Sequence, residues 1–181
     1  MGEEAIKILG LSGSYGNESK NTRLVSLALA MAEEAGADIE FWELSEKPLP
    51  LVGEEGCWQD ENVKEFQSLA SSCDAFIISS PEYHGTMSGV MKNTLDWLYK
   101  DHVGGKVFAL MSSLGGMSNS NTLNHMRICI RWLHGWVIPE QVAVGHVKDA
   151  FDDEGNLTDD EIRSRIETLV SSLIDAAKRL R

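Results

Sequence analysis

Short apolar runs and helix-like segments take turns along this chain, and that alternation limits the folds open to it. Three of the runs, at 6–11, 75–78 and 107–111, are mostly apolar. A strand buried on one face alternates apolar and polar residues, whereas a strand buried on both faces is apolar along its length. Apolar residues three or four positions apart follow each run, which is the spacing of a helix with one buried face. The pattern therefore predicts an α/β fold with helices on both faces of a parallel sheet.

Five β–α units are expected in all. The strands are predicted at 6–11, 39–44, 75–78, 107–111 and 137–144, and the helices near 22–35, 63–73, 90–98, 123–133 and 158–181. Five such units predict one domain over residues 1–181, a flavodoxin-like doubly wound sheet with strand order 2-1-3-4-5. In that order the loops after strands one, three and four gather at one edge of the sheet.

Two features near the end of the chain refine this prediction. Pro139 interrupts the fifth strand, and a proline favours an edge position because it cannot donate a hydrogen bond to a neighbouring strand. Thr158 and Glu161 have the spacing of a capping box, which predicts that Thr158 caps the last helix.

The overall charge excludes some partners. The 181 residues carry a formal net charge of −12, which argues against binding nucleic acid or an anionic membrane surface. No apolar run approaches membrane-spanning length, and the first residues lack the pattern of a signal peptide. The cysteines, Cys57, Cys73 and Cys129, form no C-x-x-C pair and are expected to be reduced thiols. These features predict a cytoplasmic protein.

The loop after the first strand is rich in hydroxyl and amide side chains. It reads S-G-S-Y-G-N-E-S-K-N-T over 12–22 and ends where a helix is expected to begin. Hydroxyls, backbone N–H groups and the positive end of a helix dipole together favour an anion such as a single phosphate. The loop matches neither a P-loop nor G-x-G-x-x-G. A second interpretation stays open, in which Ser19, Asn21 or Thr22 only caps the helix.

The segment 79–97 lies between the third strand and a helical pattern. It reads S-S-P-E-Y-H-G-T-M-S-G-V-M-K-N-T-L-D-W. A loop between a buried strand and a helix is where open α/β sheets bind ligands. Tyr83 is a large aromatic residue in that loop and is therefore a candidate for ligand contact. The alternative is that Tyr83 packs beneath a loop.

Other folds that handle phosphate or catalyse hydrolysis lack their signatures here. A receiver domain needs carboxylates at the ends of strands one and three, where this chain has L-S at 11–12 and S-S at 79–80. The G-x-S-x-G elbow of a serine hydrolase is not present around Ser12. His125 and His134 are not four residues apart and no histidine forms H-E-x-x-H, so no metal site is expected.

Taken together, these segments resemble the NAD(P)H-dependent FMN reductases, a family that includes quinone, chromate and azo-dye reductases. The G-S at 13–14 with S-K-N at 19–21 is similar to the family's G-S-x-R-x-x-S-x-N phosphate loop. The segment 81–97 is similar to its P-E-Y-N-x-S-x-P-G-x-L-K-N-A-x-D-W block. With the turn at 112–116, the resemblance spans most of the chain.

The chain departs from the family pattern at a few positions. Gly16 stands where the family usually has Arg, which leaves the preference between NADPH and NADH open. His84 stands in place of Asn beside the flavin, and Ser88 in place of Pro. The frequent G-G-x-R-x-Q run is missing after Gly116.

The resemblance implies FMN as the cofactor, with NADPH or NADH as co-substrate. The first loop would hold the FMN phosphate, the central loop would line the isoalloxazine and ribityl chain, and the turn after the fourth strand would close the other edge. The implied cofactor-binding residues are Ser14, Ser19, Asn21 and Thr22; Pro81, Glu82, Tyr83, His84 and Gly85; and Ser112, Ser113 and Gly115. No protein residue is implied as catalytic, because the cofactor carries the chemistry.

The function that the resemblance implies is hydride transfer from NAD(P)H, through FMN, to a quinone, free flavin or similar small acceptor by a ping-pong route. Two other classes stay open. One is a flavodoxin-type electron carrier without nicotinamide oxidation, for which the acidic charge is also suitable. The other is a regulatory or structural module that has lost its flavin.

The resemblance also implies a homodimer or homotetramer. Trp97, Leu98 and Tyr99 follow one another in a predicted helix, and consecutive helical positions point about 100° apart. One core face cannot cover all three side chains, so a second subunit is expected to cover at least one. Trp132 is a further candidate for a subunit contact, because aromatic residues are enriched at interfaces.

Overall fold

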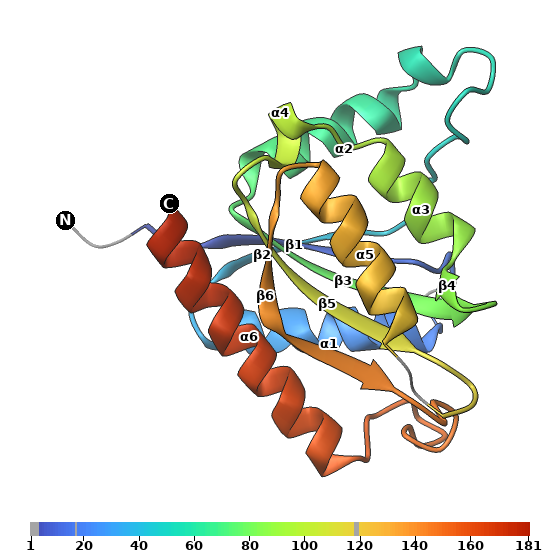
Figure 1. Cartoon of the computed structure of the whole chain (residues 1–181), viewed down its shortest axis with the longest axis vertical. Coiled ribbons are helices and arrows are strands. Elements are labelled where there is room, and N and C mark those ends of the chain that lie inside the picture. Colours follow the sequence, from blue (N-terminus) through green and yellow to red (C-terminus); the bar gives the residue numbers. More distant parts are fainter. Residues whose placement is uncertain (1–3, 17, 118–119) are drawn as a thin grey trace.

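The central sheet has the predicted parallel order. The computed structural model describes residues 4–16, 18–117 and 120–181, so Asn17 of the first loop lies outside the described residues. The strands β1 (Lys7–Ser12), β2 (Asp38–Trp42), β3 (Ala75–Tyr83), β5 (Val107–Ser113) and β6 (Trp136–Val144) run in the order β2-β1-β3-β5-β6 (Figure 1). This is the order 2-1-3-4-5 expected from the sequence. A short strand, β4 (Thr86–Met87), pairs antiparallel with the end of β3 and was not predicted.

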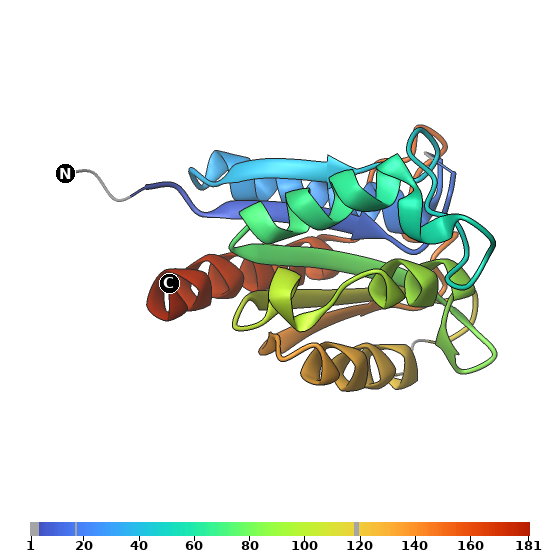
Figure 2. The ribbon, with the colours of Figure 1, turned by 90° about the horizontal axis from the view of Figure 1, so that it is seen from above.

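Helices cover both faces of the sheet, as predicted. The helices α1 (Lys20–Glu34) and α6 (Asp160–Leu180) lie on one face, and α2 (Glu61–Ser72), α3 (Gly89–Asp96) and α5 (Asn121–Trp132) lie on the other (Figure 2). Two short helices, η1 (Cys57–Gln59) and α4 (Lys100–Val103), complete the described elements. Alternate β3 residues enter the two cores, Ile77 on the α1 side and Phe76 on the α2 side.

Gly10 lets α1 pack closely against β1. A Cβ atom at this position would lie 2.6 Å from both Leu29 Cδ1 and Val25 Cγ1, and both of these side chains are buried. Because these side chains belong to a filled core, they have little room to move away. A side chain at this position would therefore displace Leu29 or Val25 and push α1 away from β1.

Replacing Gly10 with Ala is expected to destabilise the fold by about 1–3 kcal/mol, because the extra methyl group overpacks the core. Urea unfolding of the purified chain measures the change. Gly89→Ala is the matched control, since a Cβ at Gly89 meets no heavy atom within 4 Å. Equal stability of the two variants would contradict the packing argument.

The structure confirms one prediction about the end of the chain and contradicts another. Pro139 does lie in an edge strand, β6, whose pairing with β5 shifts register between Phe108 and Leu110. The capping-box prediction at Thr158 was wrong. Asp159 is the N-cap of α6 and accepts a hydrogen bond from Ile162 N, whereas Thr158 donates to the carbonyl of Ala150.

The predicted helix over 90–98 ends earlier than expected. α3 stops at Asp96, and Trp97 and Leu98 are buried in the core of the chain itself, with exposed fractions of 0% and 1%. The chain leaves the helix at Trp97, so these neighbours are not bound to the 100° spacing of helical positions. The helical argument from Trp97, Leu98 and Tyr99 is therefore wrong, although Tyr99 is 44% exposed and its cover by a second subunit stays a prediction.

Among the described residues, none of the helices combines the length and apolar character that crossing a membrane requires.

Candidate functional site

The loops that follow β1, β3 and β5 meet at one end of the sheet, on the right in Figure 1. Backbone pairing brings Ser12 beside Ser79 and Ser80 beside Ser112. The N–H of Gly13 donates to the carbonyl of Ser79 at 2.7 Å, so the first loop stays attached to β3 beyond the last paired strand residue. This is the edge where the sequence placed the site.

The start of α1 is held by a small network of hydroxyl groups. Ser19 is the N-cap and accepts a hydrogen bond from Thr22 N at 3.2 Å. The hydroxyl of Thr22 donates to the carbonyl of Gly16 and lies 3.0 Å from the hydroxyl of Ser12. The capping interpretation therefore holds for Ser19 in this structure. Ser14 and Ser19 remain half-buried, so both can also face a ligand.

The first turn of α1 suits an anion. The first N–H groups of any helix have no partner within the helix, and this first turn contains no acidic residue. Glu18, the one carboxylate in the loop 13–19, forms an ion pair with Arg23. The positive end of the helix is thus left without a neutralising carboxylate of its own.

The side chain of Asn21 is buried more deeply than a side chain that contacts a bound phosphate would be. Its side chain accepts a hydrogen bond from the Ser79 hydroxyl and donates one to the Ser113 hydroxyl, each at 2.8 Å. Asn21, Ser79 and Ser113 are all buried. The amide therefore connects α1 to the ends of β3 and β5.

The central loop is a tight hairpin between β3 and β4. Tyr83 pairs with Thr86, and the two residues between them, His84 and Gly85, have φ angles of 53° and 80°. Two positive φ angles define a type I′ turn. Histidine, like asparagine, is enriched at positive φ, so His84 in place of Asn preserves the turn. Tyr83 is 59% exposed, which rules out the alternative that it packs beneath a loop.

Glu82 points toward α5. Its carboxylate accepts hydrogen bonds from the hydroxyl of Thr122 at 3.0 Å and from Thr122 N at 3.4 Å. A carboxylate at the first turn of a helix is stabilised by the helix dipole. His125 Nδ1 lies 2.7 Å from the Thr86 hydroxyl. The first two turns of α5 thus hold the hairpin at both of its strands.

The remaining predicted residues occupy the ends of β3 and β5. Pro81, Ser112 and Ser113 are buried in the sheet, and Gly115 is exposed in the turn beyond β5. The twelve predicted site residues therefore lie in three neighbouring loops or in the strand and helix ends beside them. The side chains of Asn21, Thr22, Glu82 and Ser113 are bonded to other protein groups. Their binding role stays a prediction.

Ser88 was noted in the sequence only as a departure from Pro. Its hydroxyl caps α3 by accepting from Met91 N at 3.0 Å and donates to the carbonyl of Gly13 at 2.7 Å. The N–H of Ser88, which a proline would lack, donates to the Ser80 hydroxyl. A Cβ at Gly13 would lie 2.9 Å from Ser88 Oγ. Where the family has a rigid proline, Ser88 thus forms hydrogen bonds within the central loop and to the first loop.

Ser88→Ala is expected to lower the free energy of unfolding by about 1–2 kcal/mol, because the variant loses a helix cap and a buried hydrogen bond. Chemical denaturation with circular dichroism detection measures it. Ser164→Ala, on the exposed part of α6, is the control and should change stability by less than about 0.5 kcal/mol. A Ser88 variant as stable as that control would show that the bond to Gly13 contributes nothing.

The K-N-x-x-D-W part of the central segment has a packing role in this structure. Asn93 accepts from Val52 N and donates to the carbonyl of Pro50, and Trp97 Nε1 also donates to Pro50 at 2.9 Å. Lys92 and Asp96 form an ion pair on the surface of α3. These residues fix the loop after β2.

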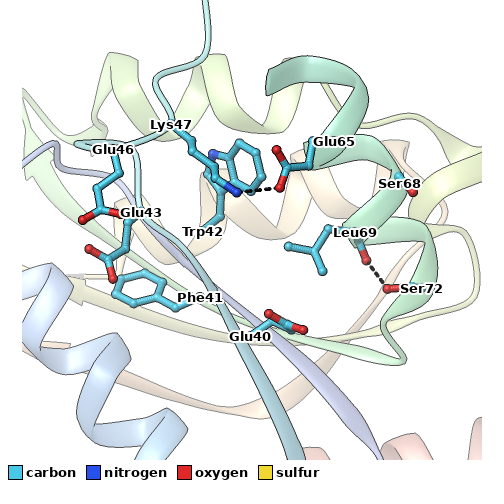
Figure 3. A pocket seen from close by; sticks show the side chains of 10 residues that line it. All are labelled: Glu40, Phe41, Trp42, Glu43, Glu46, Lys47, Glu65, Ser68, Leu69 and Ser72. Atoms are coloured by element: carbon cyan, nitrogen blue, oxygen red, sulfur yellow. Dashed lines mark hydrogen bonds and ion pairs between the residues drawn. The ribbon is translucent and has the colours of Figure 1, made fainter. Parts of the chain in front are cut away.

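The hollows beside β2 and α1 do not coincide with the three loops. One, of about 550 Å³, lies between β2 and α2 (Figure 3). Its lining includes Glu40, Glu43, Glu46 and Glu65, and its one cation, Lys47, is paired with Glu65. An excess of carboxylates repels a phosphate. Another hollow, of about 610 Å³, lies between α1 and α6.

The cysteines show no sign of a nucleophilic role. All three are free, and burial raises the pKa of the Cys73 and Cys129 thiols. Since the thiolate is the reactive form, neither is poised to react near neutral pH. Within the described part of the chain, no group of three His, Cys, Asp or Glu side chains could hold a metal ion.

Comparison with known proteins gives a family. The sequence model of the NADPH-dependent FMN reductases matches residues 6–149. An FMN-dependent NADPH-azoreductase of Staphylococcus haemolyticus is 30% identical over 176 residues, which cover 93% of this chain and 94% of the relative.

Solved structures support the same fold. FerB, a flavoenzyme NAD(P)H:(acceptor) oxidoreductase from Paracoccus denitrificans, superposes with a TM-score of 0.77 at 21% identity, over 97% of this chain and 98% of that one. A flavodoxin from the domain Archaea superposes with a TM-score of 0.65 at 13% identity, over 97% and 99% of the two chains.

The parallel sheet with its three-loop edge defines a flavodoxin-like α/β protein. Within that class, the match over residues 6–149 shows that the chain belongs to the NADPH-dependent FMN reductase family. The resemblance noted in the sequence is confirmed, and with it FMN as the cofactor and NADPH or NADH as the co-substrate.

The residues present fit FMN. The first turn of α1 has no acidic residue, the surrounding loops are rich in hydroxyls, and the exposed Tyr83 lies in the neighbouring hairpin. One phosphate can be accommodated by this arrangement through hydrogen bonds and the helix dipole, without a cluster of cations.

Proposed function

We propose that this protein oxidises NADPH or NADH on a bound FMN and reduces a small acceptor, such as a quinone, a free flavin or an azo compound, by a ping-pong route. The observation that carries the proposal is the open edge where the loops after β1, β3 and β5 meet, with Tyr83 59% exposed. The reduced state of the cysteines and the acidic charge agree with a cytoplasmic location.

The first loop supplies the phosphate contacts in this proposal. The hydroxyls of Ser14 and Ser19 and the first N–H groups of α1 would surround the phosphate, where the helix dipole favours negative charge. The side chain of Thr22 is already bonded to the loop carbonyl of Gly16, so its contribution to the ligand is through orientation of the loop.

The other two loops position the rest of the cofactor. Pro81, Tyr83, His84 and Gly85 would line the isoalloxazine and ribityl chain, and the turn from Ser112 to Gly115 would close the other edge. Bound FMN supplies the hydride chemistry. Backbone N–H groups of these loops can stabilise negative charge that develops on it. Tyr83 is 59% exposed, so small molecules can reach the hairpin in turn, which supports a ping-pong order.

Anaerobic mixing with NADPH or NADH tests the proposal. The flavin absorbance of the protein loaded with FMN is expected to bleach rapidly, and to return when a quinone, free flavin or azo dye is added. A flavodoxin-type electron carrier would hold FMN but would not bleach with either nicotinamide. A protein that binds no FMN would match a module that has lost its flavin.

We also propose that two copies associate through α5. Its outer side presents Ile128 and Trp132, 55% and 77% exposed, and Trp136 follows at 59%. Of the α-helices described, α5 is the one without Asp or Glu, and none occurs between Asp101 and Glu140. Copies with a charge of −12 repel each other elsewhere, so this apolar face offers the least costly approach. The exposed residues of α5 thus support the predicted association of subunits in place of Trp97, which is buried.

Trp132→Glu is expected to raise the dimer dissociation constant at least about tenfold, or about 1.4 kcal/mol, because it places a charge at the apolar face. Sedimentation at micromolar concentration measures it. Leu180→Glu, at a residue 51% exposed on α6, is the matched control. A wild-type chain that sediments at 20.0 kDa would sink the proposal.

A further inference from the structure

One buried amide joins all three loops of the site. Asn21 Oδ1 accepts from the hydroxyl of Ser79 and Asn21 Nδ2 donates to the hydroxyl of Ser113, both at 2.8 Å. Asn21 belongs to the first turn of α1, Ser79 to β3 and Ser113 to the end of β5. No other side chain in the described structure is bonded to both β3 and β5 from α1.

The burial of this group decides what it can do. Asn21 is 4% exposed, Ser79 is 0% and Ser113 is 4%. A side chain that binds phosphate has to point its hydrogen-bond donors toward the solvent-facing site. The Asn21 amide instead uses its oxygen and one N–H in bonds with protein hydroxyls. Losing either bond would leave a buried polar group unpaired, which is costly. The amide is thus committed to the protein.

We propose that Asn21 is a positioning residue, which sets the spacing of the three flavin loops and does not itself bind the phosphate. The inference rests on the proposed FMN binding and changes the role given to Asn21 by the sequence resemblance. Phosphate contact then belongs to the half-buried Ser14 and Ser19 and to the N–H groups of the α1 first turn.

The two roles differ in what they do to riboflavin, which is FMN without its phosphate. A residue that holds only the phosphate affects FMN affinity and leaves riboflavin affinity alone. A residue that sets the distance between loops affects both flavins by the same factor, since the isoalloxazine is held between those loops.

The experiment compares dissociation constants for FMN and riboflavin by quenching of flavin fluorescence. Asn21→Ala is expected to raise both constants by a similar factor, about tenfold, as for a lost buried hydrogen bond. Ser19→Ala is expected to raise the FMN constant alone. Thr94→Ala removes a buried hydroxyl that bonds only within α3, to the carbonyl of Val90, and should change neither constant.

The partners of the amide provide a second measurement that does not need flavin. Asn21→Ala, Ser113→Ala and the double variant are unfolded in urea as apoproteins. The effect of Ser113→Ala should shrink once Asn21 is already replaced, because the two changes remove the same bond. If Asn21→Ala does not fold, Ser79→Ala takes its place in the flavin titrations with the same expectation, because Ser79 is fully buried and is not among the predicted flavin contacts.

The outcomes separate the possibilities. FMN affinity that falls in Asn21→Ala while riboflavin affinity holds would overturn the inference and make Asn21 a phosphate ligand. Additive effects of the two replacements on unfolding would overturn it as well. A wild-type chain that binds neither flavin would instead overturn the proposed function, and the inference with it, before any variant is compared.

Discussion

Strands buried on both faces can place polar side chains only where they leave the sheet, and the site depends on that constraint. The apolar runs of these strands end in serines: Ser12 closes β1, Ser112 and Ser113 close β5, and Ser79 and Ser80 follow the apolar start of β3. Parallel pairing sets Ser12 beside Ser79 and Ser80 beside Ser112. Buried hydroxyls need partners. Those partners are Asn21 and Thr22 at the start of α1 and Ser88 at the start of α3.

The layout of the fold could be predicted from the sequence because it follows from local periodicity and a topological rule. Apolar runs with helical segments between them imply parallel strands, and five units imply the doubly wound order. Pro139 identified an edge strand because a missing N–H is a local property. The same reasoning placed the three loops together, since the carboxyl ends of parallel strands share one edge.

Contacts between loops could not be predicted, because they depend on strand register. Nothing in S-K-N shows that Asn21 turns inward to Ser79 and Ser113, and an outward asparagine would have the same sequence. The end of α3 was also missed, since neither Gly nor Pro follows Asp96 to mark it. The chain leaves the helix there because Trp97 is held by Pro50, a tertiary bond.

The distribution of charge lets an acidic chain accept anionic cofactors. The net charge of −12 opposes FMN and a dinucleotide at long range, yet screening confines that field to about a Debye length, roughly 8 Å in the cell. Within that distance the local groups decide. The first turn of α1 has no acidic residue, and the sequence from His102 to Pro139, which supplies the β5 side of the site, has none either. An anion that reaches this edge therefore meets hydroxyls and N–H groups, and the two carboxylates of the adjoining loops, Glu18 and Glu82, are bonded to Arg23 and Thr122. Four more carboxylates line the separate hollow between β2 and α2. The same stretch forms the outer side of α5, so the proposed binding edge and the proposed contact face between two copies share one segment without carboxylates.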